Sequence, residues 1–225
     1  MKILFEDKYL LACEKPVGIE SQASSSGKTD MLMLLSQHRL EKGEEPYVGL
    51  VHRLDTATGG AMIYSKREDM TGKLSALVQS GDFKKVYLAA VHGRPDEDRG
   101  EMRDLLYHDK MKNKSFVCDK ERKGVKEAIL NYRTLESVES GDGVISLVEV
   151  ELITGRTHQI RVQFASRKMP LVGDGKYGSH DNRAKMPALF SYRIAFSVFG
   201  RSYDIKKSPD KQSYPWSLFD EVNYD

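Results

Sequence analysis

The sequence contains little cysteine. Its two cysteines, Cys13 and Cys118, lie far apart and form no CxxC pair, which argues against a disulfide framework or a cysteine-based zinc site and suits a reducing cytosol. The six histidines are His38, His52, His92, His108, His158 and His180. They show neither the HExxH pattern nor another metal-ligand spacing. We therefore expect no resident metal.

Long apolar stretches are absent as well. No run approaches the roughly 18 apolar residues that a membrane-spanning helix needs. The first residues also lack the basic, apolar and small-residue succession of a signal peptide. These two absences predict a soluble, cytoplasmic protein without membrane contact.

The chain also has little net charge. Its formal value of +2 is too small for the whole surface to attract a polyanion, so any such affinity must come from a local concentration of positive charge. One candidate is the segment from Lys110 to Lys126, which contains seven lysines and arginines and only two acidic residues. Within it, Lys120, Arg122 and Lys123 are the predicted contacts. The alternative is a solvated hairpin that only keeps the protein soluble.

The 225-residue length suits a single domain over residues 1–225. Apolar residues on one face predict helices at 30–40, at 68–80 and at 158–167, the last with Thr157 as N-cap. β-Branched and aromatic runs predict strands at 3–5, 9–13, 83–92, 101–106, 115–118, 127–135, 144–152 and 189–199. Because helices and strands do not alternate regularly, we predict an α/β fold of the α+β type, with a large mixed, mainly antiparallel sheet and flanking helices.

Residues 52–60, His-Arg-Leu-Asp-Thr-Ala-Thr-Gly-Gly, stand out for the chemistry they could support. They follow a predicted strand at 49–53 and precede another at 61–64. Asp55 is therefore expected on irregular backbone, where reactive side chains are usually presented. The alternative is a turn in which the aspartate hydrogen-bonds its own backbone.

A second segment, Thr-Gly-Arg-Thr-His-Gln-Ile-Arg at 154–161, decides the question by resemblance. Together the two segments resemble the HRLDxxTSG and GRTHQIR signatures of the RluA-type pseudouridine synthases. Residues 11–18 resemble the family's KPxG turn, 85–87 its K-x-Y strand and 173–178 its GDxxYG loop. The matches run in family order over about residues 9–196. Departures occur at Gly59, usually Ser, at Ala61, usually Leu, and at 189–191, Leu-Phe-Ser in place of Leu-His-Ala.

This resemblance implies a pseudouridine synthase fold with a central RNA-binding cleft across the sheet. It also implies isomerisation of uridine in ribosomal or transfer RNA. The separate N-terminal RNA-binding domain of many relatives is not expected here. The reaction breaks the N-glycosidic bond, turns the uracil and joins C5 to the same sugar carbon, which requires no cofactor. The resemblance makes Asp55 the catalytic carboxylate. The residues leave open whether it attacks or stabilises the sugar carbon, or removes a sugar proton.

The resemblance also assigns partners to Asp55. Arg161 is expected to pair with the carboxylate and keep it ionised; the alternative is a surface arginine on an amphipathic helix. Tyr87 is expected to be a catalytic residue that packs on the target base and helps to remove the C5 proton, although an ordinary core tyrosine would look the same. Lys85 shares its strand face and is expected to point into the same cleft, either towards an RNA phosphate or in a structural role.

Two further arginines are candidates for RNA contacts. Arg53 is expected to fill the gap left by a flipped nucleotide, because its planar guanidinium can stack and bind phosphate. Arg156, just ahead of a helix, is expected to hold a phosphate. We expect His52 to be a packed or capping residue without catalytic duty.

Other classes of protein fit less well. The Ser-rich stretch 21–28 predicts a flexible loop, and 24–29 ends like a phosphate-binding P-loop but has Gln22 where that motif needs glycine. A non-catalytic RNA-binding protein or RNA chaperone would have no need of a carboxylate facing an anionic ligand. A hydrolase acting on the same bond would release free uracil. RNA is thus the expected partner, no obligate protein partner is predicted, and a monomer suffices.

Overall fold

The computed structural model describes residues 1–22, 27–141 and 143–220. The chain divides into two compact units. The first unit comprises Met1–Lys84 and Ser191–Lys207, and the second comprises Lys85–Phe190 and the segment that begins at Ser208. Residues 23–26 of the expected Ser-rich loop lie outside the described residues. A single functional domain over the whole chain stays a prediction.

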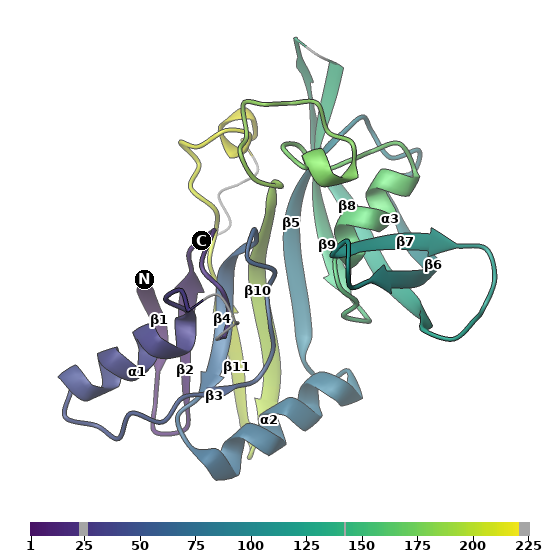
Figure 1. Ribbon diagram of the computed structural model, residues 1–225. Coiled ribbons are helices and arrows are strands. Elements are labelled where there is room, and N and C mark those ends of the chain that lie inside the picture. Colours follow the sequence, from purple (N-terminus) through teal and green to yellow (C-terminus); the bar gives the residue numbers. More distant parts are fainter. Residues whose placement is uncertain (23–26, 142, 221–225) are drawn as a thin grey trace. The chain divides into compact units, whose positions relative to one another are not determined.

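The first unit is built on strands most of which pair antiparallel (Figure 1). These are β1 (Lys2–Glu6), β2 (Leu10–Lys15), β3 (Gly49–Leu50), β4 (Gly59–Ser65), the greater part of β10 (Leu189–Val198) and β11 (Arg201–Lys206). The strand order is β1-β2-β4-β10, while β11 pairs with β10 and β3 with β4. β4 is buried along its whole length, which explains its nearly continuous apolar sequence.

Two helices accompany these strands, and both were predicted from apolar spacing. α1 (Met31–Glu41) begins at Asp30, whose carboxylate accepts the backbone N–H groups of Leu32 and Met33. α2 (Glu68–Ser80) ends at Gly81, which adopts a left-handed conformation with φ of 90°. Leu74 of α2 is fully buried in the core of this unit. Its partners there come mainly from β2, β4, β10 and β11, namely Leu10, Ala12, Ile63, Ile194, Phe196, Tyr203 and Ile205.

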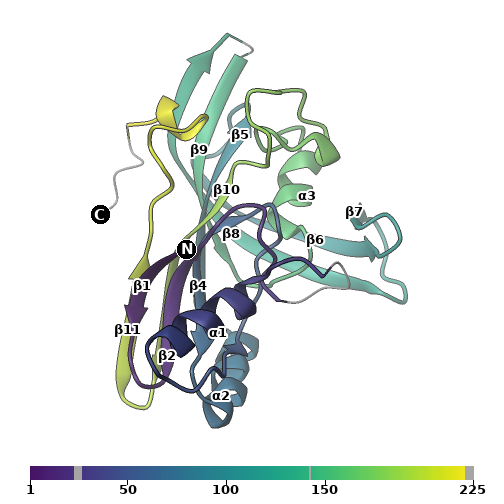
Figure 2. The same cartoon turned by 60° about the vertical axis from the view of Figure 1, so that its left-hand side comes forward.

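The second unit carries a run of five antiparallel strands. They are β5 (Lys84–His92), β6 (Arg99–Asp109), β7 (Lys114–Cys118), β8 (Val125–Ser140) and β9 (Gly143–Leu152). Their order is β5-β9-β8-β6-β7. α3 (Gln159–Ser166) packs near β6 and β7, and a short 3-10 helix, η1 (Gly175–Tyr177), follows it (Figures 1 and 2). The predicted α/β fold with mainly antiparallel sheet and few helices is confirmed.

Two local predictions were wrong. The strand expected at 49–53 is limited to Gly49–Leu50, and the backbone N–H of Ile63 donates to the His52 ring instead of to a strand partner. Thr157 does not cap α3. The cap is His158, in a left-handed conformation with φ of 55°. The Thr157 carbonyl instead accepts a hydrogen bond from Ser115 Oγ, a tertiary contact that local propensity does not reveal.

The cationic segment also differs from a single hairpin. Lys110 and Lys112 lie in the turn between β6 and β7, whereas Lys120, Arg122 and Lys123 lie in the following turn between β7 and β8. We call residues 105–124 the basic hairpin. It forms part of the second unit.

Candidate active site

The backbone around Asp55 is fastened on both sides within the first unit. Ser21 Oγ donates to the carbonyl of Leu54 at 2.8 Å and lies 3.1 Å from the Leu54 nitrogen, whose N–H it accepts. On the other side, Gly18 N–H donates to the Thr56 carbonyl at 2.8 Å. The Asp55 carbonyl accepts Thr58 N–H at 2.9 Å. Hydrogen bonds to residues distant in sequence therefore hold the turn in place. Asp55 itself is half-buried.

Lys15 adds a positive charge to this support. Its side chain is fully buried, and Nζ donates to the backbone carbonyl oxygens of Pro16 at 3.0 Å, Ile19 at 2.5 Å and Thr56 at 3.3 Å. Burial lowers the pKa of Lys15 to about 8, while the negative charge of Asp55 acts in the opposite direction. Lys15 thus ties the KPxG-like turn to the residue that follows Asp55.

Close packing between β4 and β10 surrounds two of the positions that depart from the family pattern. Gly60 has a φ of 114°, and a Cβ there would lie 2.3 Å from the Ser191 carbonyl oxygen, so only glycine fits. Ser191 Oγ in turn donates to the Ala61 carbonyl at 2.9 Å. Ala61 and Ser191, which both depart from the family pattern, are therefore joined by one hydrogen bond between β4 and β10.

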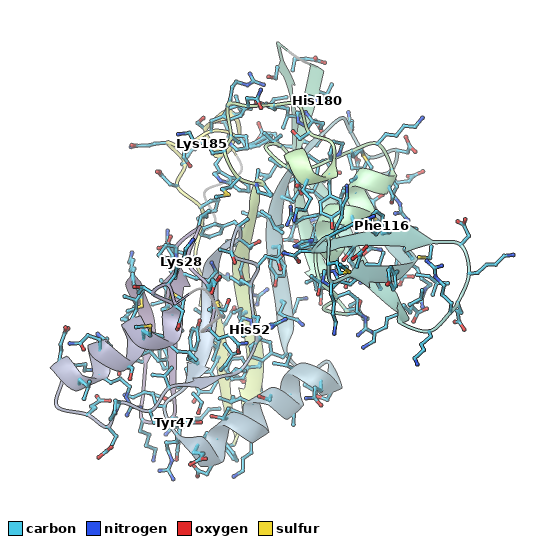
Figure 3. The ribbon with its side chains drawn as sticks, viewed as in Figure 1. Lys28, Tyr47, His52, Phe116, His180 and Lys185 are labelled. Carbon is cyan, nitrogen blue, oxygen red and sulfur yellow. The ribbon has the colours of Figure 1, made fainter. Side chains whose placement is uncertain are left out.

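His52 and Arg53, three and two residues before Asp55, differ in environment. His52, labelled in Figure 3, is buried and accepts Ile63 N–H through Nε2 at 3.1 Å. Its ring centre lies 5.3 Å from that of Phe83. This confirms the expected packing role. Arg53 is exposed, which agrees with an RNA contact, and its role stays a prediction.

In the second unit, Arg161 is held by a carboxylate that sequence reasoning did not assign. Its Nε and Nη2 donate to Asp174 at 2.6 and 2.8 Å, and both side chains are almost completely buried, at 7% and 1% exposure. Such a paired geometry fixes a guanidinium in orientation as well as in position. The GDxxYG-like segment at 173–178 was the available signal. The expected pairing of Arg161 with Asp55 joins residues of different units and stays a prediction.

Tyr87 and Lys85 lie on β5 of the second unit. Tyr87 is 5% exposed and Lys85 is 9% exposed. Burial lowers the pKa of Lys85. A Cβ built on Gly155 would lie 3.6 Å from Lys85 Nζ, so this ammonium group lies beside the segment 154–161 that carries Arg161. A base-packing role for Tyr87 stays a prediction.

The remaining predicted RNA contacts are exposed. Arg156 Nε donates to the Glu127 carbonyl at 2.8 Å, which ties its exposed side chain to β8. Lys120 and Lys123 are exposed in the second turn of the basic hairpin. Arg122 in the same turn has its guanidinium carbon 5.3 Å from the Tyr107 ring centre. These positions suit phosphate contacts.

Among residues 1–22, 27–141 and 143–220, no group of three or more His, Cys, Asp and Glu side chains could hold a metal ion. Within the same ranges, no helix has the length and apolar character to cross a membrane.

The buried Arg161–Asp174 pair predicts a large stability effect. Removing one partner leaves a buried charge uncompensated, so Asp174→Ala should lower the free energy of unfolding by about 3–5 kcal/mol. The matched control is Asp204→Ala. Asp204 pairs with Arg193 at the same 2.6 and 2.8 Å, but these side chains are 45% and 34% exposed. Asp204→Ala should therefore lower the free energy of unfolding, measured with urea, by less than about 1 kcal/mol. Equal losses of stability in the two variants would show that the buried pair matters no more than the exposed one.

Lys15 predicts a pH dependence of stability. Below pH 8 it is protonated in the folded and unfolded chain alike. Between about 8 and its ordinary 10.5, the unfolded chain binds the proton that the folded chain has lost, so its contribution to the free energy of unfolding rises with pH. Urea unfolding from pH 8 to 10 should therefore show the wild type gaining stability relative to Lys15→Met. A constant difference would rule out the lowered pKa.

Comparisons with known proteins agree with these segments. A family model described as RNA pseudouridylate synthase matches residues 9–166. The uncharacterized RNA pseudouridine synthase YhcT of Bacillus subtilis is 32% identical over 195 residues, covering 86% of this chain and 63% of the relative. The ribosomal large subunit pseudouridine synthase C of Buchnera aphidicola is 35% identical over 177 residues, covering 78% and 53%. The chain thus spans between half and two thirds of the length of these relatives.

Solved structures show the same fold. Human RNA pseudouridylate synthase domain containing 1 matches with a TM-score of 0.76 at 21% identity, covering 93% of this chain and 83% of that one. The human domain-containing 4 protein also gives 0.76, at 22% identity, covering 93% and 89%. As the resemblance to RluA-type enzymes led us to expect, this chain belongs to the RNA pseudouridylate synthase family.

Proposed function

We propose that the chain is an RNA pseudouridine synthase that isomerises specific uridines in ribosomal or transfer RNA, with Asp55 as its catalytic carboxylate. The observation that carries this proposal is the fastened turn at Asp55. Ser21 and Lys15 hold the backbone on either side of it, and the turn falls inside the segment that matches the family. A reacting carboxylate must be positioned to a fraction of an ångström, which such ties provide.

The proposed reaction conserves every atom of the nucleotide except one exchanged proton. The bond from N1 to the sugar carbon breaks, the uracil turns, and C5 bonds to the same carbon. The C5 proton leaves to water and N1 gains a proton. Asp55 acts either on the sugar carbon or on a sugar proton, and both roles need it ionised. Arg161 is the proposed cation for Asp55.

The remaining residues take roles in RNA recognition. Tyr87 packs on the extruded uracil, and Lys85 lies on the same face of β5. Arg53 occupies the space that the uridine vacates, which offsets part of the few kcal/mol that unstacking costs. Phosphates are held by Arg156 and the basic hairpin. We further propose a central cleft as the RNA site, a cytoplasmic location and a monomer.

The catalytic assignment predicts that Asp55→Asn abolishes pseudouridine formation while RNA affinity stays within about tenfold of wild type, because the amide keeps the shape and loses the charge. Tritium release from RNA labelled at uridine C5 measures turnover. Asp204→Asn is the control, since it removes a surface carboxylate of the same unit. Turnover by purified Asp55→Asn protein would overturn the assignment.

The basic hairpin predicts a salt effect. Each phosphate contact contributes about 0.7–0.9 to the slope of log affinity against log salt concentration. Replacing Lys120, Arg122 and Lys123 by Ala should therefore weaken binding and lower that slope by about 2. A control triple of exposed lysines of the first unit, Lys2, Lys8 and Lys73, should leave the slope unchanged. A hairpin variant with the wild-type slope would exclude these residues as RNA contacts.

A further inference from the structure

Tyr177 is the point where three elements of the second unit meet. It ends η1 and directs its side chain to β7 and α3. Its hydroxyl oxygen accepts the Ser115 backbone N–H at 2.8 Å and hydrogen-bonds His158 Nδ1 at 2.9 Å. Burial raises the pKa of this hydroxyl, so it stays neutral and can donate and accept at once. One hydroxyl therefore joins the basic hairpin to the start of the helix that carries Arg161.

The ring of Tyr177 makes a separate set of contacts. The guanidinium carbon of Arg161 lies 5.0 Å from the ring centre, a cation–π distance. Asp174 binds the Nε and Nη2 edge of the same guanidinium. Arg161 is therefore held at its edge by a carboxylate and at its face by an aromatic ring. Lys114 Nζ at the start of β7 lies 5.3 Å from the ring centre. The ring thus contacts cations of both α3 and β7.

Further bonds tie the hairpin to the same place. Ser115 is 2% exposed, and its Oγ donates to the Thr157 carbonyl at 2.6 Å. Lys176 Nζ, next to Tyr177, donates to the Asn113 carbonyl in the first hairpin turn at 3.0 Å. A strand at the end of the β5-β9-β8-β6-β7 run would ordinarily be held by its strand partner alone. Here β7 is also anchored to the loop after α3.

The backbone supports a functional reading of this junction. His158, which meets the Tyr177 hydroxyl, has a φ of 55°, a left-handed conformation that costs a non-glycine residue about 1 kcal/mol or more. Such strain persists only where the surroundings demand it, and it concentrates at functional sites. The same residue caps α3, and Arg161 follows it by three positions, in the first turn of the helix.

We propose that Tyr177 is a positioning residue with two separable duties. Its hydroxyl holds the basic hairpin in the orientation that binds RNA. Its ring holds the guanidinium of Arg161 in place for the chemical step. This inference rests on the proposed function, and it goes beyond it by assigning RNA capture and catalytic alignment to different atoms of one side chain.

Two substitutions separate these duties. Tyr177→Phe keeps the ring and removes the hydroxyl, so the KM for RNA should rise about five- to tenfold while kcat stays within about twofold. Tyr177→Leu also removes the ring, so kcat should fall by a further factor of about ten. Steady-state tritium release from an unmodified transcript that the wild type converts measures both constants. A protein that was merely less stable would lose active fraction, which lowers apparent kcat and leaves KM unchanged.

Hydrogen exchange supplies a readout that needs no activity. The Ser115 amide should exchange faster in Tyr177→Phe than in wild type, because its acceptor is gone. Tyr203→Phe is the matched control, since the Tyr203 hydroxyl donates to Asp7 at 3.0 Å within the first unit; it should change neither KM nor Ser115 exchange. If the wild-type protein formed no pseudouridine, the proposed function would be refuted. The exchange measurement would still test whether the Tyr177 hydroxyl holds the hairpin.

Two results would overturn the inference while the proposed function survives. One is a Tyr177→Phe protein with wild-type KM and wild-type Ser115 exchange, which would show that the hydroxyl does not hold the hairpin. The other is a Tyr177→Phe protein whose kcat falls as far as that of Tyr177→Leu, which would show that ring and hydroxyl do not have separate duties.

Discussion

The hydrogen bonds that fix the backbone on either side of Asp55 are the constraint on which the candidate site depends. Lys15 reaches across 41 residues of sequence to the Thr56 carbonyl, and Ser21 reaches across 33 to Leu54. An aspartate side chain has few rotatable bonds, so once its backbone is fixed its carboxylate can occupy only a small volume. These long-range hydrogen bonds hold an irregular turn in place and so support the proposed catalytic carboxylate.

The cations of the second unit fall into two classes that suit two different tasks. Arg161 is buried and held by Asp174 and by the Tyr177 ring, which gives it one orientation and little freedom to adapt. Lys120, Arg122 and Lys123 are exposed, so water and salt screen them and they attract a polyanion without a defined geometry. The proposed reaction on one nucleotide of a long RNA would use both kinds of positive charge, and Tyr177 contacts Arg161 as well as β7 of the basic hairpin.

Much of the fold could be predicted from sequence, because local patterns determined it. α2 was predicted at its observed bounds and α1 to within one residue, because each has apolar residues at the spacing of one helix face. The failures concern details that local patterns did not reveal. His158 and not Thr157 caps α3, and the pairing of Asp174 with Arg161 was not expected. The resemblance supplied the residues around Asp55, but a motif does not state which atoms hold it. The pairing of Asp55 with Arg161 stays a prediction.

The central claim is that this chain converts uridine to its carbon-linked isomer without breaking the RNA. The most direct measurement is chromatography of the nucleosides released from unmodified RNA after incubation with the purified chain and no added cofactor. The account predicts a new nucleoside with the mass of uridine and a different retention time, in an amount equal to the uridine lost. Unchanged uridine in RNA that the chain demonstrably binds, or free uracil with abasic sites, would contradict it.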